Sequence, residues 1–157
     1  MQSVFKAGNR RLDYTDFSVR DWKLLPGDVT TAVNWLARQE GADSGCIAVV
    51  GASIGANSAL LAAAADKRVH TLVLLSPGLD YHGLKTERAM EQYGTRSIFL
   101  LASADDEYSA GTVKRLGLLA RGRNAVKVFQ KAGHGTGMFG VEPTLPVLIE
   151  GWLKENL

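Results

Sequence analysis

The stretch CIAVVGASIGANSALLAAAA, residues 46–65, contains a serine between two glycines where a short apolar run gives way to an alanine-rich one. The run at 46–50 is typical of a buried strand, and residues 54–65 are typical of a helix. A G-x-S-x-G sequence between such elements predicts a sharp, strained turn that lifts the hydroxyl of Ser53 clear of the sheet edge. Ser53 is therefore a candidate nucleophile, and the alternative is a serine that only forms a turn.

The neighbours of Ser53 fit this prediction. We expect Gly51 and Gly55 to be glycines because a side chain at either position would collide where strand and helix meet closely. The backbone N–H of Ile54, at the start of the helix, is expected to point toward the position of an oxyanion. The sequence therefore predicts a nucleophile with one hydrogen-bond donor for the developing negative charge.

Apolar strand-like runs and helical patterns alternate along the rest of the chain. This spacing predicts an α/β fold with a parallel sheet of about four strands flanked by helices. No repeat or linker divides the sequence, so we expect a single domain over residues 1–157. Residues 1–26 have no clean period, and an irregular segment is expected there. The predicted strands are 46–50, 71–75, 97–101 and 125–129, and the predicted helices are 28–39, 54–65, 109–119 and 146–157.

Composition excludes several classes of protein. The net charge of +2 is too balanced to indicate nucleic-acid binding, and the single cysteine, Cys46, rules out a disulfide framework. No apolar run reaches the roughly 18 residues that a membrane span needs. The first residues lack the apolar core of a signal peptide, which favours a cytoplasmic location. No metal-binding or phosphate-binding motif occurs, so we expect neither a metal nor a cofactor.

Four segments stand out: GASIGAN at 51–57, LSP at 75–77, ASADD at 102–106 and AGHG at 132–135. Together they resemble the α/β-hydrolase superfamily, in particular its dienelactone-hydrolase-like and serine-esterase branch. The resemblance runs from about Asp16 to the C-terminus. It implies a catalytic triad in the chain order serine, acid, histidine.

The base and the acid follow the ends of predicted strands, where the sites of open α/β sheets lie. His134 comes after the last strand in a glycine-rich loop, where the family places its base; the alternative is an ordinary loop histidine. The resemblance favours Asp106 over its neighbour Asp105 as the acid. Asp80 is a rival, because some members carry the acid after the preceding strand. Any of these aspartates could instead form a turn or cap a helix.

The chain departs from the family pattern before Ser53. The family carries about four strands ahead of the nucleophile, and here only 50 residues precede Gly51, so the first half of the sheet is expected to be missing. The loop that supplies a second oxyanion donor belongs to that half. The edge of strand 46–50 would then be apolar and unpaired. We expect a second copy, in a dimer, or residues 1–26 to cover it.

These observations predict a serine hydrolase that cleaves small carboxylic esters. The alternatives are a weakly active or non-catalytic module that works through association, and a peptidase or acyltransferase with the same triad. Four residues near the predicted site are candidates for an apolar substrate wall, although each could equally belong to the core: Leu79, Tyr81, Met138 and Phe139.

Overall fold

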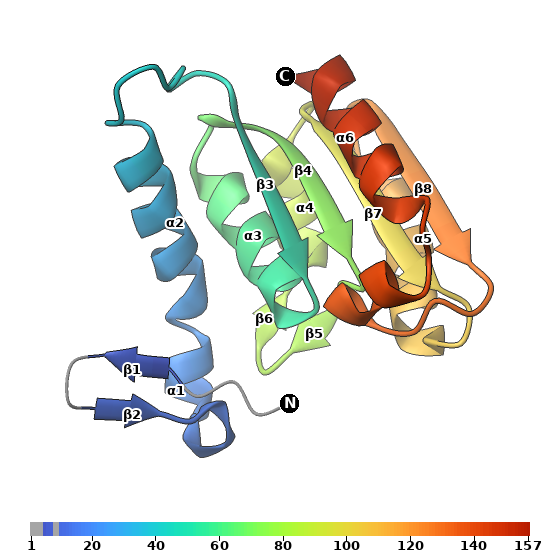
Figure 1. The fold of residues 1–157 in the computed structure, drawn as a ribbon, viewed down its shortest axis with the longest axis horizontal. Coiled ribbons are helices and arrows are strands. Elements are labelled where there is room, and N and C mark those ends of the chain that lie inside the picture. Colours follow the sequence, from blue (N-terminus) through green and yellow to red (C-terminus); the bar gives the residue numbers. More distant parts are fainter. Residues whose placement is uncertain (1–4, 8–9) are drawn as a thin grey trace.

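A four-stranded parallel sheet forms the centre of the computed structural model, which describes residues 5–7 and 10–157 (Figure 1). Its order is β3-β4-β7-β8, so each strand pairs with the next one along the chain. The predicted α/β fold class is confirmed. The strands are β3 (Ile47–Ala52), β4 (Val69–Leu75), β7 (Ser97–Ser103) and β8 (Asn124–Phe129).

Helices cover both faces of this sheet (Figure 1). Four of them pack side by side in chain order on one face, and one helix lies alone on the other. The first group is α2 (Leu25–Leu36), α3 (Ile54–Ala65), α4 (Glu87–Tyr93) and α5 (Glu107–Leu119), and the single helix is α6 (Leu145–Asn156). Sequence patterns located these helices within three residues, except for α4, which they missed.

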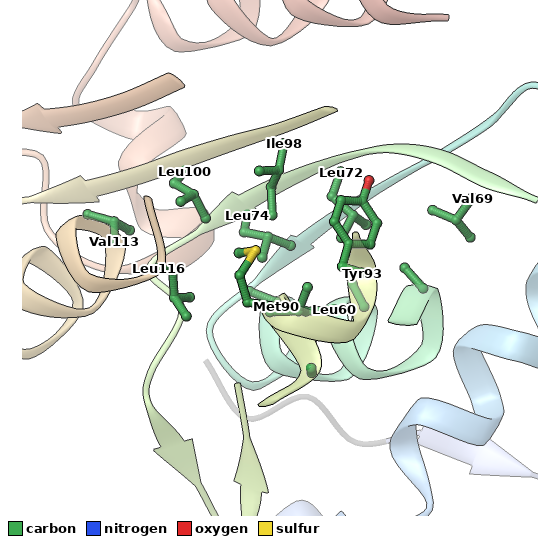
Figure 2. Packing of buried hydrophobic residues seen from close by; sticks show 14 of the residues in the cluster. Leu60, Val69, Leu72, Leu74, Met90, Tyr93, Ile98, Leu100, Val113 and Leu116 are labelled. Carbon is green, nitrogen blue, oxygen red and sulfur yellow. The ribbon is translucent and has the colours of Figure 1, made fainter. Parts of the chain in front are cut away.

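The sheet separates two apolar cores, and this explains the nearly continuous apolar strands. In β4, Leu72 and Leu74 face the core under α3, α4 and α5, shown in Figure 2. Val73 and Leu75 alternate with them and face the core under α6. Trp152 of α6 closes this second core by stacking on Phe99, with ring centroids 5.2 Å apart. Covered on both faces, the strands hold their carboxyl ends in fixed positions beside the site.

The prediction for residues 1–26 needs correction. Residues 5–7 and 10–12 form a short hairpin, β1 (Phe5–Ala7) and β2 (Arg10–Leu12), followed by the 3-10 helix η1 (Tyr14–Asp16) and by α1 (Val19–Trp22). Each element is too short to show a period in the sequence. Local caps start the helices: Ser18 and Asp21 form a reciprocal capping box on α1.

The segment before α2 contacts a second small hairpin, β5 (Asp80–Tyr81) with β6 (Leu84–Lys85). The ring of Trp22 stacks on His82 at the tip of this hairpin, with centroids 4.5 Å apart. In Figure 1 the β5–β6 hairpin lies below the carboxyl ends of β3 and β4, and α1 lies below α2. In the described part of the chain, no helix has both the length and the apolar character to cross a membrane.

Candidate active site

Ser53 lies at the turn between β3 and α3, where the sequence placed it. Its backbone has φ 55° and ψ −127°, a left-handed conformation that non-glycine residues rarely adopt. The Ser53 N–H donates to the carbonyl of Leu75 at the end of β4, 2.9 Å away, which ties the strained turn to the sheet. Such strain costs about 1–3 kcal/mol and persists only where surrounding contacts enforce it.

The two glycines that flank this serine differ in the space available for a side chain. A Cβ at Gly51 would lie 2.6 Å from the carbonyl oxygen of Gly55 and 2.8 Å from the Cα of Ala56, so no side chain fits there. A Cβ at Gly55 would meet nothing within 4 Å. The expectation of a collision is therefore wrong for Gly55, because α3 turns its second residue away from β3. The N–H of Ile54 occupies the first position of α3, where the helix itself provides no acceptor.

His134 lies in the loop after β8, immediately before the 3-10 helix η2 (Gly135–Gly140). Its Nε2 is 2.7 Å from the hydroxyl oxygen of Ser53, and its Nδ1 is 2.6 Å from a carboxylate oxygen of Asp106. An ionised carboxylate only accepts hydrogen bonds, so the proton resides on Nδ1 and leaves Nε2 free to accept the serine proton. The imidazole joins the hydroxyl and the carboxylate directly.

Asp106 caps α5 and follows β7. Its side chain accepts the N–H of Ser109 at 3.3 Å in addition to the imidazole N–H, and it is 16% exposed. Burial alone would raise the pKa of Asp106, but hydrogen bonds from Ser109 and His134 outweigh that effect and hold the pKa below its usual range. The carboxylate is therefore ionised at neutral pH and can stabilise a positive charge on the imidazole.

The two alternative acids lie elsewhere. One oxygen of Asp105 accepts hydrogen bonds from the Ser103 hydroxyl and from the N–H of Gly133, at 3.3 Å for the latter. Asp80 belongs to the β5–β6 hairpin, where its carboxylate accepts the N–H of Gly83 at 2.7 Å. Of the three predicted candidates, Asp106 is the one that the structure brings to the imidazole.

The four candidate residues for the substrate wall lie in different surroundings. Tyr81 presents its ring edge-on to His134, with centroids 6.5 Å apart, and it is partly buried. Leu79 packs against the core under α3, α4 and α5. Met138 is completely buried in the core under α6, so the prediction that it lines a substrate site is wrong. Phe139 is 45% exposed and lines an apolar groove with residues of α6.

Sequence reasoning missed the polar residues that support this site. Asn57 of α3 is completely buried; its amide donates to the carbonyls of Gly78 and Leu84, at 2.9 and 2.7 Å, and accepts the N–H of Gly78 at 2.9 Å. These bonds fix the hairpin that carries Tyr81. Ser76 directly follows β4, Ser103 is the last residue of β7, and the hydroxyls of both accept backbone N–H groups of the His134 loop. The signal available in the sequence was a serine close behind each of the apolar runs 71–75 and 97–101.

Comparison with known proteins identifies the architecture. A family profile described as "alpha/beta hydrolase fold" matches residues 22–130. A search of curated proteins found no match.

Solved structures of similar fold include three hydrolases. For dienelactone hydrolase from Anabaena variabilis, the TM-score is 0.69 at 18% identity, over 85% of this chain and 59% of that one. For an acetyl xylan esterase from Paenibacillus sp. R4, the TM-score is 0.75 at 14% identity, over 98% of this chain and 60% of that one. For EstE1, a thermophilic carboxylesterase cloned from a metagenomic library, the TM-score is 0.55 at 17% identity, over 87% of this chain and 61% of that one. The chain thus spans about three fifths of the length of each.

Proposed function

The chain belongs to the α/β-hydrolase fold family, and from this membership we propose that it is a serine hydrolase that cleaves carboxylic esters through an acyl-enzyme intermediate. One observation carries the proposal: the Ser53 hydroxyl, the His134 imidazole and the Asp106 carboxylate are joined by hydrogen bonds of 2.7 and 2.6 Å. The similar folds of an acetyl xylan esterase and a carboxylesterase favour an ester as the substrate.

The geometry supports a two-step reaction. The Ser53 oxygen attacks the ester carbonyl while Nε2 of His134 takes the hydroxyl proton, and Asp106 stabilises the imidazolium that forms. His134 then returns the proton to the departing alcohol. In the second step a water molecule, deprotonated by the same nitrogen, attacks the acyl group, and the acid product leaves as Ser53 regains its proton.

The negative charge that develops on the ester oxygen needs hydrogen-bond donors. The N–H of Ile54 supplies one donor, and the sequence offers no counterpart for the loop that gives the family its second. Removal of one oxyanion donor costs about 10²–10³ in turnover in measured cases. We therefore expect slow turnover from this chain by itself. A leaving group that departs easily, such as a nitrophenolate, suits a first assay.

A fluorophosphonate probe tests the proposal most directly, because it reacts with an activated serine without requiring turnover. We expect one covalent adduct, located by peptide mass spectrometry on Ser53 and absent from Ser53→Ala. Ser58 is a useful internal control, since its hydroxyl donates to the carbonyl of Ile54 at 2.8 Å within α3. A folded sample that gives no adduct on Ser53 would contradict the proposal and favour a module that works by association.

We propose in addition that two copies meet at the β3 edge. In the described residues β3 has a strand partner on one side only, and Val50 there is 47% exposed. An identical strand running antiparallel satisfies the unpaired main-chain groups of both copies. The groove beside this edge is lined by apolar side chains apart from one acid and one base, which pair with each other within α6. Its lining residues are Val50, Phe139, Pro146, Ile149, Glu150, Leu153, Lys154 and Leu157.

Light scattering coupled to gel filtration tests this interface. We expect the mass of a dimer for the unmodified protein and the mass of a monomer for Val50→Lys, because a charged side chain on an edge strand blocks pairing. Leu118→Lys is the matched control. Leu118 is 82% exposed and belongs to α5, which packs on β7 and β8 at the other end of the sheet. A stable monomer at micromolar concentration would refute the dimer.

A further inference from the structure

The loop that carries His134 is held from two sides by side chains outside the triad. We propose that Ser76, Ser103 and Asp105 are positioning residues, which fix the imidazole over Ser53 by binding backbone N–H groups on either side of His134. This inference rests on the proposed function, because the placement of the imidazole matters for catalysis only if it serves as the base.

The upstream side of the loop is held by the end of β7. The hydroxyl of Ser103, which is completely buried, accepts the N–H of Ala132 at 2.7 Å and donates to Asp105. The same Asp105 oxygen accepts the N–H of Gly133 at 3.3 Å. Two consecutive backbone donors immediately before His134 therefore end on one connected pair of side chains.

The downstream side is held by the end of β4. Ser76 is completely buried, and its hydroxyl accepts the N–H of Gly135 at 3.0 Å. The backbone of Ser76 is left-handed, with φ 49°, an uncommon conformation outside glycine. Strain at a buried strand end beside a candidate site indicates that the position of this hydroxyl is enforced by its surroundings.

Side chains hold the backbone before His134 because residues 130–134 lie between the end of β8 and the start of η2 and belong to neither element. Gly133 and Gly135, the two neighbours of His134, have φ of 75° and 56°, values that belong to neither a strand nor a right-handed helix. Catalytic groups need placement within about 0.5 Å, and a displacement of about 1 Å can cost 10²-fold in rate. The three side chains add a constraint on the backbone at both sides of His134.

Asp105 offers the sharpest test, because both of its bonds end on a single oxygen atom. Asparagine keeps an oxygen at that position but removes the charge, whereas alanine removes the acceptor. A positioning residue must therefore tolerate Asp105→Asn better than Asp105→Ala. A residue that acted through its negative charge would fail equally in both variants.

We expect Asp105→Ala to lower kcat for a nitrophenyl ester by about 10- to 100-fold with little change in KM. Asp105→Asn should recover most of that loss. The proton on Nδ1 of His134 should give a downfield NMR signal in the unmodified protein. That signal should weaken or broaden in Asp105→Ala and return in Asp105→Asn. Asp43→Ala is the control: Asp43 is also exposed and accepts a backbone N–H, that of Gly45 at 2.8 Å, in a turn before β3.

The outcomes separate this inference from the proposed function. If Ser53 of the unmodified protein neither reacts with the probe nor turns over esters, the proposed function fails. If the unmodified protein is active and Asp105→Ala matches it in kcat and in the NMR signal, the positioning role is wrong. Equal losses in the alanine and asparagine variants would also overturn it. Should Asp105→Ala not fold, Ser76→Ala replaces it, with the same expected fall in kcat and unchanged KM.

Discussion

Replacing His134 with alanine is expected to slow ester hydrolysis by about 10⁵- to 10⁶-fold. In a serine hydrolase the loss of the base costs nearly as much as the loss of the nucleophile, because an unassisted hydroxyl does not attack an ester at neutral pH. In this chain Nε2 of His134 is the atom 2.7 Å from the Ser53 oxygen. The measurement is kcat/KM for a short-chain nitrophenyl ester, followed by nitrophenolate absorbance.

His70→Ala is the matched control for this prediction. His70 is an exposed residue at the opposite, amino-terminal end of β4, so its loss should leave the rate unchanged. Melting temperatures of both variants should match that of the unmodified protein, since neither side chain belongs to a core. A His134→Ala variant that keeps more than about a tenth of the rate would remove the imidazole from the mechanism.

Replacing Gly51 with alanine is expected to destabilise the fold by about 3 kcal/mol, a large overpacking penalty. The added carbon would lie 2.6 Å from a main-chain oxygen of α3, and backbone at a strand–helix junction cannot move away as a flexible side chain can. For a chain of this size the loss corresponds to a fall of about 6–12 °C in Tm. Circular dichroism during heating and urea titration measure it.

Gly55→Ala provides the comparison at the other end of the same motif. Its added carbon meets nothing within 4 Å, and alanine favours a helix over glycine by about 1 kcal/mol. The Tm should therefore stay unchanged or rise. If the two alanine variants melted at the same temperature, the close approach of β3 and α3 at residue 51 would not be a determinant of stability.

The strands and most helices were predictable from the sequence because their patterns repeat over many residues. Runs such as 71–75 and 97–101 are apolar after their first residue since both faces of the sheet are covered, and this is the pattern of parallel strands. Elements that depend on a few local contacts were not predictable. The clearest case is α1, a four-residue helix held by a capping box between Ser18 and Asp21.

The candidate site divides in the same way. Ser53, Asp106 and His134 follow strand ends, and the rule that sites form at the carboxyl edge of a parallel sheet anticipates their proximity. The burial of a side chain and the space around a glycine were harder to predict, because both depend on packing between segments that are distant in the sequence. Met138 is near His134 in the chain but points into the core under α6. Gly55 matches the motif although the space around it is open.

The arrangement of helices has a consequence for synthesis on the ribosome. Every strand of the sheet pairs with its nearest predecessor, so one face acquires its cover progressively as α2, α3, α4 and α5 emerge. The other face waits for α6, which follows all four strands. Until residues near 152 have been translated, a nascent polypeptide exposes the apolar face of the sheet that α6 later covers. Chaperones bind polypeptides that expose such surfaces.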